Sequence, residues 1–117
     1  MAATITDFGG RFRRYVETGT ANAILTVTVA PGVPFRVLTV TTAYSGSPTQ
    51  AGVTVTLDSG AGAGYDATLS TGSANTRYTT YQPSEPLVLV GDDAVVVAAP
   101  AGGGSLTSST VVVVELL

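Results

Sequence analysis

The stretch from Ile24 to Tyr44 reads ILTVTVAPGVPFRVLTVTTAY, and its early part alternates between apolar and threonine side chains. Successive side chains of a strand point to opposite faces, so Leu25, Val27 and Val29 share one face while threonines occupy the other. The segment PFRVLTVTTAY predicts a second strand, and the prolines and glycine before it mark a turn. The stretch therefore predicts two strands of a half-buried sheet.

The same period-two pattern continues along the chain. VTVTL, at residues 53–57, places Val53, Val55 and Leu57 on one face. Turns rich in Gly, Ser, Asn and Pro separate the apolar segments, and no segment shows helical periodicity over three turns. These patterns predict an all-β fold: an antiparallel β-sandwich, jelly-roll-like, with about eight short strands, although an immunoglobulin-like strand order fits the same spacing. The further strands are expected at residues 65–70, 76–81, 85–90, 93–99 and 109–116.

Two apolar runs, Leu87–Val90 and Val111–Val114, are continuous rather than alternating. A strand with one wet face should alternate, so a continuous run indicates that both of its faces are covered. A chain of 117 residues has too little sheet to cover every strand twice. Two explanations remain open: a surface outside the chain covers the second face, or a loop caps a central strand.

The chain carries few charges. Charged residues make up 11% of it, against about 25% in an ordinary soluble domain. Threonine, serine and glycine take their place, which indicates that much of the surface faces other protein. The formal net charge of −3 argues against nucleic acid as a partner. No apolar segment approaches the roughly 18 residues of a membrane span, so no membrane partner is expected either.

Several reactive residue types are missing, namely histidine, cysteine, lysine and tryptophan. Without histidine or cysteine the usual zinc and transition-metal sites cannot form. Ser-His-Asp, Cys-His and Ser-Lys nucleophilic arrangements are excluded for the same reason. We therefore expect no enzyme activity, no cofactor and no metal. The absence of cysteine fits synthesis in a reducing cytoplasm.

Two groups of loop carboxylates have ordinary structural interpretations. Asp58 and Asp66 flank a glycine-rich loop of a kind that can hold calcium, but the calcium-loop spacing is missing. A flexible hairpin connection is the better interpretation. Asp92 and Asp93 follow a glycine, and adjacent carboxylates on a strand would point to opposite faces. We interpret them as part of a turn that leads into the strand at 93–99.

The tyrosines at 44, 65, 78 and 81 allow a functional interpretation as a row that stacks on sugar rings. Tyr65 lies in register with Ala67 and Leu69, so we expect it to pack inward. Tyr78 and Tyr81 are three residues apart and so fall on opposite strand faces. Burial in the core or at a subunit interface is therefore the favoured interpretation.

Residues 1–20 differ in composition from the rest of the chain. They contain few apolar residues, the pair Gly9-Gly10 and three of the five arginines. We expect an N-terminal arm over residues 1–20 and a β-sandwich domain over residues 21–117. Arginine forks and aromatic anchors dominate many interfaces, so the arm is expected to bind a partner, with a solvated tail as the alternative. The expected protein-interaction residues are Phe8, Arg11, Phe12, Arg13, Arg14 and Tyr15.

The run from Pro34 to Pro100 resembles the small β-sandwich, jelly-roll-like virion proteins of tailed bacteriophages. The similarity is carried by VTVTLDSG (53–60), YDATL (65–69), an aromatic-threonine strand, and PLVLVGDDAVVV (86–97) before a final valine strand. The resemblance implies a structural virion protein of the capsid decoration or cement type, with a head–tail or fibre component as an alternative. It brings no catalytic residues.

The resemblance also implies partners and a location. It implies a homo-oligomer, expected to be a trimer, that is made in the host cytoplasm. This oligomer would bind the major capsid protein on the capsid exterior of the virion and stabilise the head lattice. The low charge and the two apolar runs agree with this interpretation. The alternative from another functional class is a glycan- or receptor-binding β-sandwich module that uses tyrosines and loop carboxylates.

Overall fold

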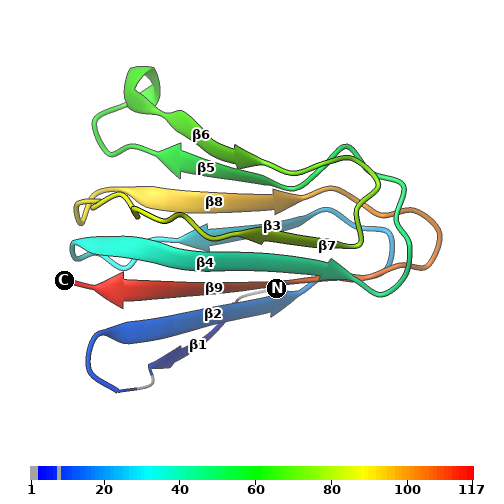
Figure 1. Cartoon of the computed structure of the whole chain (residues 1–117), viewed down its shortest axis with the longest axis horizontal. Coiled ribbons are helices and arrows are strands. Elements are labelled where there is room, and N and C mark those ends of the chain that lie inside the picture. Colours follow the sequence, from blue (N-terminus) through cyan, green and yellow to red (C-terminus); the bar gives the residue numbers. More distant parts are fainter. Residues whose placement is uncertain (1–2, 8) are drawn as a thin grey trace.

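The computed structural model describes residues 3–7 and 9–117, and they form two antiparallel sheets packed face to face (Figure 1). The predicted all-β antiparallel sandwich is confirmed. The five-stranded sheet has the order β1-β2-β9-β4-β7, and the four-stranded sheet has the order β3-β8-β5-β6. The elements are β1 (Thr4–Asp7), β2 (Phe12–Thr18), β3 (Leu25–Val29), β4 (Phe35–Tyr44), β5 (Thr54–Asp58), the 3-10 turn η1 (Ala63–Tyr65), β6 (Ala67–Thr71), β7 (Tyr78–Tyr81), β8 (Ala94–Ala99) and β9 (Ser108–Leu116).

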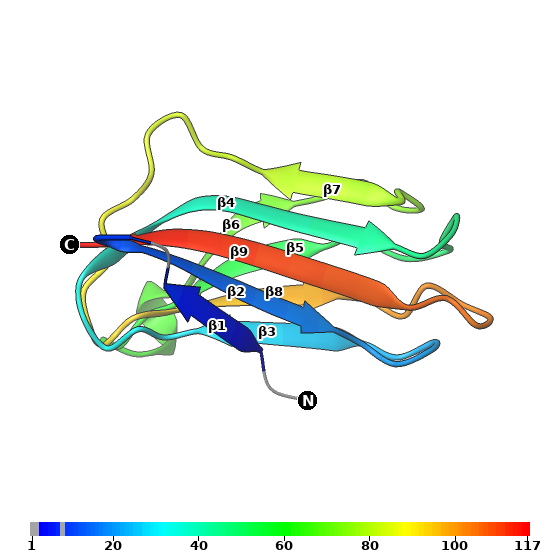
Figure 2. The ribbon, with the colours of Figure 1, turned by 90° about the horizontal axis from the view of Figure 1, so that it is seen from below.

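The strand order is that of a jelly roll with one added strand. β1 lies at the margin of the five-stranded sheet beside β2 (Figure 2). The other eight strands form two sheets in which early strands pair with late ones: β2 with β9, and β3 with β8. An immunoglobulin-like sandwich places its first two strands in one sheet, whereas β2 and β3 lie in different sheets here. The order therefore matches a double Greek key.

Alternating apolar residues from both sheets build the core. In β3 the side chains of Leu25, Val27 and Val29 are buried and the threonines between them are exposed, as predicted. Val95 and Val97 on β8 are fully buried as well. Each buried aliphatic side chain stabilises the fold by roughly 1.5–3 kcal/mol relative to exposure. The period-two signal therefore identifies the face that holds the sheets together.

The prediction that residues 1–20 form an arm outside the core is wrong for residues 12–18. β2 pairs along its length with β9, from Phe12 opposite Glu115 to Thr18 opposite Ser109. Tyr15 is only 4% exposed and belongs to the core cluster. The segment is held because β9 needs a hydrogen-bonding neighbour on each side, and β2 supplies one of the two.

Two smaller expectations are also wrong. Residues 85–90 form no strand; their only ladder contact in the described part of the chain is an isolated bridge between Leu89 and Phe35. Pro83 and Pro86 limit strand pairing there because proline donates no backbone hydrogen bond. Tyr65 does not pack inward: it lies in η1, where its side chain is 70% exposed.

Candidate interaction surface

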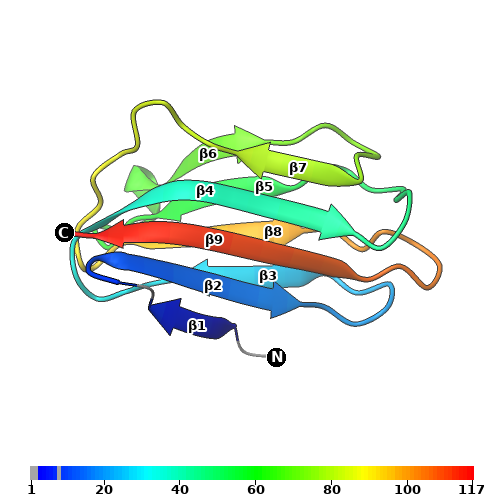
Figure 3. The same ribbon diagram turned by 60° about the horizontal axis from the view of Figure 1, so that its bottom comes forward.

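The five-stranded sheet presents one face to the core and the other face outward. Figure 3 looks onto this sheet, with the four-stranded sheet behind it. Burial alternates along β9: Val112 and Val114 are fully buried, while Val111 and Val113 are half-buried on the opposite side. We call this opposite side the outer sheet face. Its residues on the four strands β2, β9, β4 and β7 include Val16, Val111, Val113, Thr39, Thr41, Ala43, Tyr78 and Thr80.

The register shows how little charge this face carries. One row runs from Val16 through Val111 and Thr41 to Thr80. The neighbouring row contains Val113 and Thr39 together with Arg14, which is exposed. The middle of the outer sheet face is therefore a valine and threonine surface on four paired strands. The continuous run in β9 is explained by its central position, because one half of the run enters the core and the other half lies on this face.

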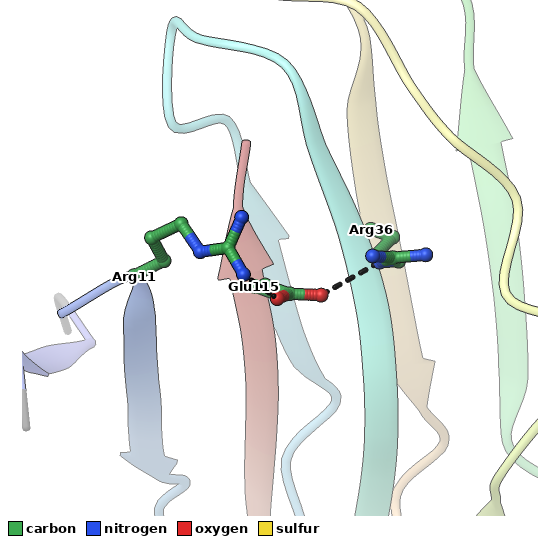
Figure 4. A network of polar contacts seen from close by, with 3 residues as sticks. All are labelled: Arg11, Arg36 and Glu115. Carbon is green, nitrogen blue, oxygen red and sulfur yellow. Dashed lines mark hydrogen bonds and ion pairs between the residues drawn. The ribbon is translucent and has the colours of Figure 1, made fainter.

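A network of three charged side chains marks one end of the outer sheet face (Figure 4). The Glu115 carboxylate accepts a hydrogen bond from Arg36 Nε at 2.7 Å and forms an ion pair with Arg11 Nη2 at 3.0 Å. Glu115 is 8% exposed, so removing both arginines would leave a poorly hydrated, unpaired charge. The network joins β9, β4 and the residue that precedes β2. Arg11 is thus already engaged within the chain.

Arg13 is engaged within the chain as well. Its Nε donates to Asp7 Oδ1 at 2.6 Å and its Nη2 donates to Asp7 Oδ2 at 3.3 Å, which ties β2 to β1. The hydrogen bond from Arg13 holds the pKa of the Asp7 carboxyl below its usual value, and the same bond raises the pKa of Arg13. This fork therefore stabilises the strand pair locally.

The predicted interaction residues do not form one cluster. Tyr15 points into the core, Arg13 pairs with Asp7, and Arg11 pairs with Glu115. Phe12, 39% exposed, and Arg14 lie on the outer sheet face. Phe8 lies outside the described residues. Sequence reasoning missed Val16 and the threonines of β4, which face outward; the alternation within VLTVTTAY was the available signal.

A second exposed apolar surface lies at the end of the sandwich where the chain terminates (Figure 1). The Leu89–Phe35 bridge holds the β7–β8 connection there, and Leu117 N donates to Pro34 O at 2.8 Å. Gly91 packs closely against the backbone of Gly32 and Val33, so the two loops touch. We call the exposed side chains of this region the end patch. They are Val33, Leu87, Val88, Val90 and Leu117, each between 41% and 63% exposed.

The loop carboxylates hold the backbone in place. Asp93 accepts hydrogen bonds from the backbone N–H groups of Gly60 and Val90, both at 3.0 Å, and these bonds lower the pKa of its carboxyl. Asp66 accepts one from Ser59 N at 2.8 Å. Within residues 3–7 and 9–117, no three acidic side chains gather in a way that could hold a metal ion. No helix of the same residues is long and apolar enough to cross a membrane.

The tyrosines do not form a row. Tyr44 is buried, its hydroxyl donates to the Pro100 carbonyl at 2.7 Å, and its burial raises its pKa. Tyr81 packs against the core from β7. Tyr78 lies on the outer sheet face, 63% exposed, with the Arg77 guanidinium 5.2 Å from its ring centre. Tyr65 belongs to the loop of the other sheet, so the two exposed rings come from different layers.

Comparisons with known proteins identify the fold. No family model matches the chain, and a search of curated proteins finds no match. A selenomethionine-labelled point mutant of chitosan-binding module 1, from a chitosanase/glucanase of Paenibacillus sp. IK-5, is similar with a TM-score of 0.54 and 12% identity, over 87% of this chain and 75% of that one. The unmutated module gives a TM-score of 0.51 and 13% identity, over 86% and 74% of the two chains.

A capsid chain is similar over a greater part of both molecules. It comes from the acidic stable capsid structure of Helicobacter pylori bacteriophage KHP30, with a TM-score of 0.51 and 14% identity, over 97% of this chain and 94% of that one. At these identities the likeness concerns the fold alone. The chain therefore has a β-sandwich fold that is shared by carbohydrate-binding modules and a phage capsid component.

Proposed function

We propose that the chain is a structural virion protein that assembles through the outer sheet face. The observation that carries the proposal is the valine and threonine surface in the middle of the outer sheet face, a region in which the register places Arg14 as a charged side chain. Interface centres are depleted in charged residues. A stable interface buries about 800 Å² per partner, roughly one-seventh of the 5960 Å² that this chain exposes. In this proposal the outer sheet face and the end patch supply that area.

Two further observations support this proposal. The likeness to the KHP30 capsid chain covers 97% of this chain and 94% of that one. The chain also carries 11% charged residues, which is a poor composition for a protein that must stay soluble as a solitary monomer. The surfaces that are apolar in the isolated chain are then the surfaces that a partner would cover.

More specifically, we propose that this virion protein is a capsid decoration or cement protein. In this proposal copies of the chain form a homotrimer through the outer sheet face, and the end patch contacts the major capsid protein on the exterior of the head. A head–tail or fibre component would use the same surfaces with different partners. The arginines contribute less to binding than their number indicates, because Arg11 and Arg13 are paired within the chain.

The test introduces a charge into the outer sheet face. The Val113→Glu variant should keep its fold, because Val113 is half-buried and faces outward. Its affinity for self-association should fall by at least about tenfold, since a charge in the middle of an interface must be desolvated. Thr28→Glu, on the exposed face of β3, is the matched control. Sedimentation velocity and light scattering measure the mass. A wild-type chain that stays monomeric at micromolar concentration, or a Val113→Glu variant that associates normally, would contradict the proposal.

Glycan binding is the second candidate function. It is favoured by the likeness to the chitosan-binding module, a fold match of similar strength, and by the exposed ring of Tyr65. The ring lies beside Asp66, whose carboxylate is engaged with Ser59, so hydrogen bonds to sugar would come from the neighbouring backbone. A glycan array with the wild-type chain and Tyr65→Ala tests this candidate. Binding that depends on Tyr65 would replace the structural role.

A further inference from the structure

A pocket of about 290 Å³ opens between β2, β3 and the loop that joins them. Figure 2 shows this loop passing from one sheet to the other at one end of the sandwich. The loop is fixed by backbone hydrogen bonds from Gly19 N to Ser108 O and from Asn22 N to Leu106 O, both at 2.8 Å. The walls are therefore preformed. The pocket is lined by Glu17, Gly19, Thr20, Ala23, Ile24, Leu25 and Thr26.

Glu17 is the unusual member of this lining. It is 9% exposed and lies on the core-facing side of β2, opposite Thr110. The Thr110 hydroxyl is engaged with the Thr42 hydroxyl at 2.7 Å. No hydrogen bond or ion pair joins the Glu17 carboxylate to another described residue. A carboxylate can accept about four hydrogen bonds, and the Glu17 carboxylate in this pocket accepts none from the described residues.

The surroundings offer no counter-ion. Among the described residues no arginine lines the pocket, and the chain contains no lysine at all. One buried hydroxyl nearby, Ser108 Oγ, also has no partner. It would lie 3.5 Å from a Cβ placed on Gly19, so it sits just behind the pocket wall. A carboxylate that faces a partly enclosed pocket without a counter-ion favours a cation there, because the pair forms charge-assisted hydrogen bonds.

We propose that this pocket binds a primary ammonium group, with Glu17 as its counter-ion. The volume is close to the lower limit for small-molecule sites, which suits one alkylammonium chain or one amino-sugar ring. Thr20, Thr26 and the loop backbone line the same pocket and supply further polar groups, while Leu25 and Ile24 supply an apolar wall. The inference is independent of the virion role and uses a surface other than the outer sheet face.

The test is a titration followed by amide NMR shifts of the whole chain. n-Butylammonium chloride should give saturable shifts over residues 19–26 with a dissociation constant of about 1 mM or tighter, whereas neutral N-butylacetamide should not. Two further pairs of ligands distinguish an amino sugar from a lysine side chain as the source of the ammonium group. They are glucosamine with N-acetylglucosamine, and Nα-acetyl-lysine amide with its Nε-acetylated form. Sodium chloride at equal ionic strength corrects for general salt effects.

Glu17→Gln is the diagnostic variant, because it keeps shape and removes charge. It should weaken ammonium binding by at least about tenfold, since the charge-assisted bond is lost. Glu85→Gln, an exposed carboxylate in the β7–β8 connection, should bind as the wild type does. Equal binding by Glu17→Gln, equal binding of the neutral analogue, or no saturation by about 10 mM would overturn the proposal. The charged and neutral ligands test the wild type even if the variant fails to fold.

Discussion

Deletion of residues 2–20 is expected to abolish folding, because the segment contains a paired strand of the five-stranded sheet. Tyr15 is 4% exposed, and truncation of a buried aromatic side chain costs about 3–5 kcal/mol. The seven residues of β2 also form the ladder with β9, where each backbone hydrogen bond contributes about 1 kcal/mol net. A domain of this size has a total free energy of unfolding of about 5–15 kcal/mol. The deletion therefore removes most or all of the free energy of unfolding.

Far-UV circular dichroism and urea unfolding measure the effect. A graded version, Tyr15→Ala, should lower the free energy of unfolding by about 3–5 kcal/mol and keep the β-rich spectrum. The matched control is deletion of residues 2–7, which removes β1, a strand whose residues are all exposed. That variant should still unfold cooperatively, since the exposed Asp7–Arg13 pair contributes little. A chain lacking residues 2–20 that kept the wild-type spectrum and midpoint would refute the place of β2 in the sheet.

Gly52→Ala should lower the free energy of unfolding by about 2–3 kcal/mol, because Gly52 has φ +112° and an added Cβ would collide with the Gly72 carbonyl oxygen. Gly62 has φ +117° and open space around it, so Gly62→Ala should lower the free energy of unfolding by less than Gly52→Ala does, as measured by urea unfolding. Equal losses in the two variants would show that the contact with Gly72 is unimportant. Asp93→Asn should lower the melting temperature at neutral pH. The folded pKa of Asp93 lies below its usual value of 3.8, so its contribution is present above that value and is lost as pH falls through the folded pKa. Thermal melts across the acid range should therefore converge for the two proteins, and parallel profiles would contradict this reasoning.

The strands with a clean alternation were predictable, and β2 was not. β3 and β5 each place apolar residues on one face and threonines on the other. β2 places Arg13, Tyr15 and Glu17 on its core-facing side, so its polarity does not alternate. The structure explains how charges are tolerated there. Arg13 reaches Asp7 on the neighbouring strand, and Glu17 opens into a pocket. Neither solution has a local sequence signal.

The candidate surface was predictable only in part. The run Val111–Val114 correctly indicated a strand with two apolar faces, but which of its residues face outward depends on pairing with strands about 70 and 100 residues earlier in the chain. The Arg36–Glu115 contact joins residues 79 positions apart, and no short motif announces it. A bulge between Val37 and Thr39 also shifts the outward set on β4 by one residue. The bulge is visible only once β4 is aligned with β9.

The two apolar runs differ in how they can meet a partner. β9 is hydrogen-bonded to β2 on one side and to β4 on the other, so its backbone is already engaged. Val111 and Val113 can therefore contact a partner through side chains only, which favours packing of one sheet face against another surface. An edge strand would instead invite open-ended strand pairing and aggregation. The run at Leu87–Val90 is bonded at Leu89 to Phe35 and otherwise projects exposed side chains from a loop. In the proposed assembly the loop run, which can adjust its shape, would therefore contact the major capsid protein, while the outer sheet face around β9 would contact other copies of the chain.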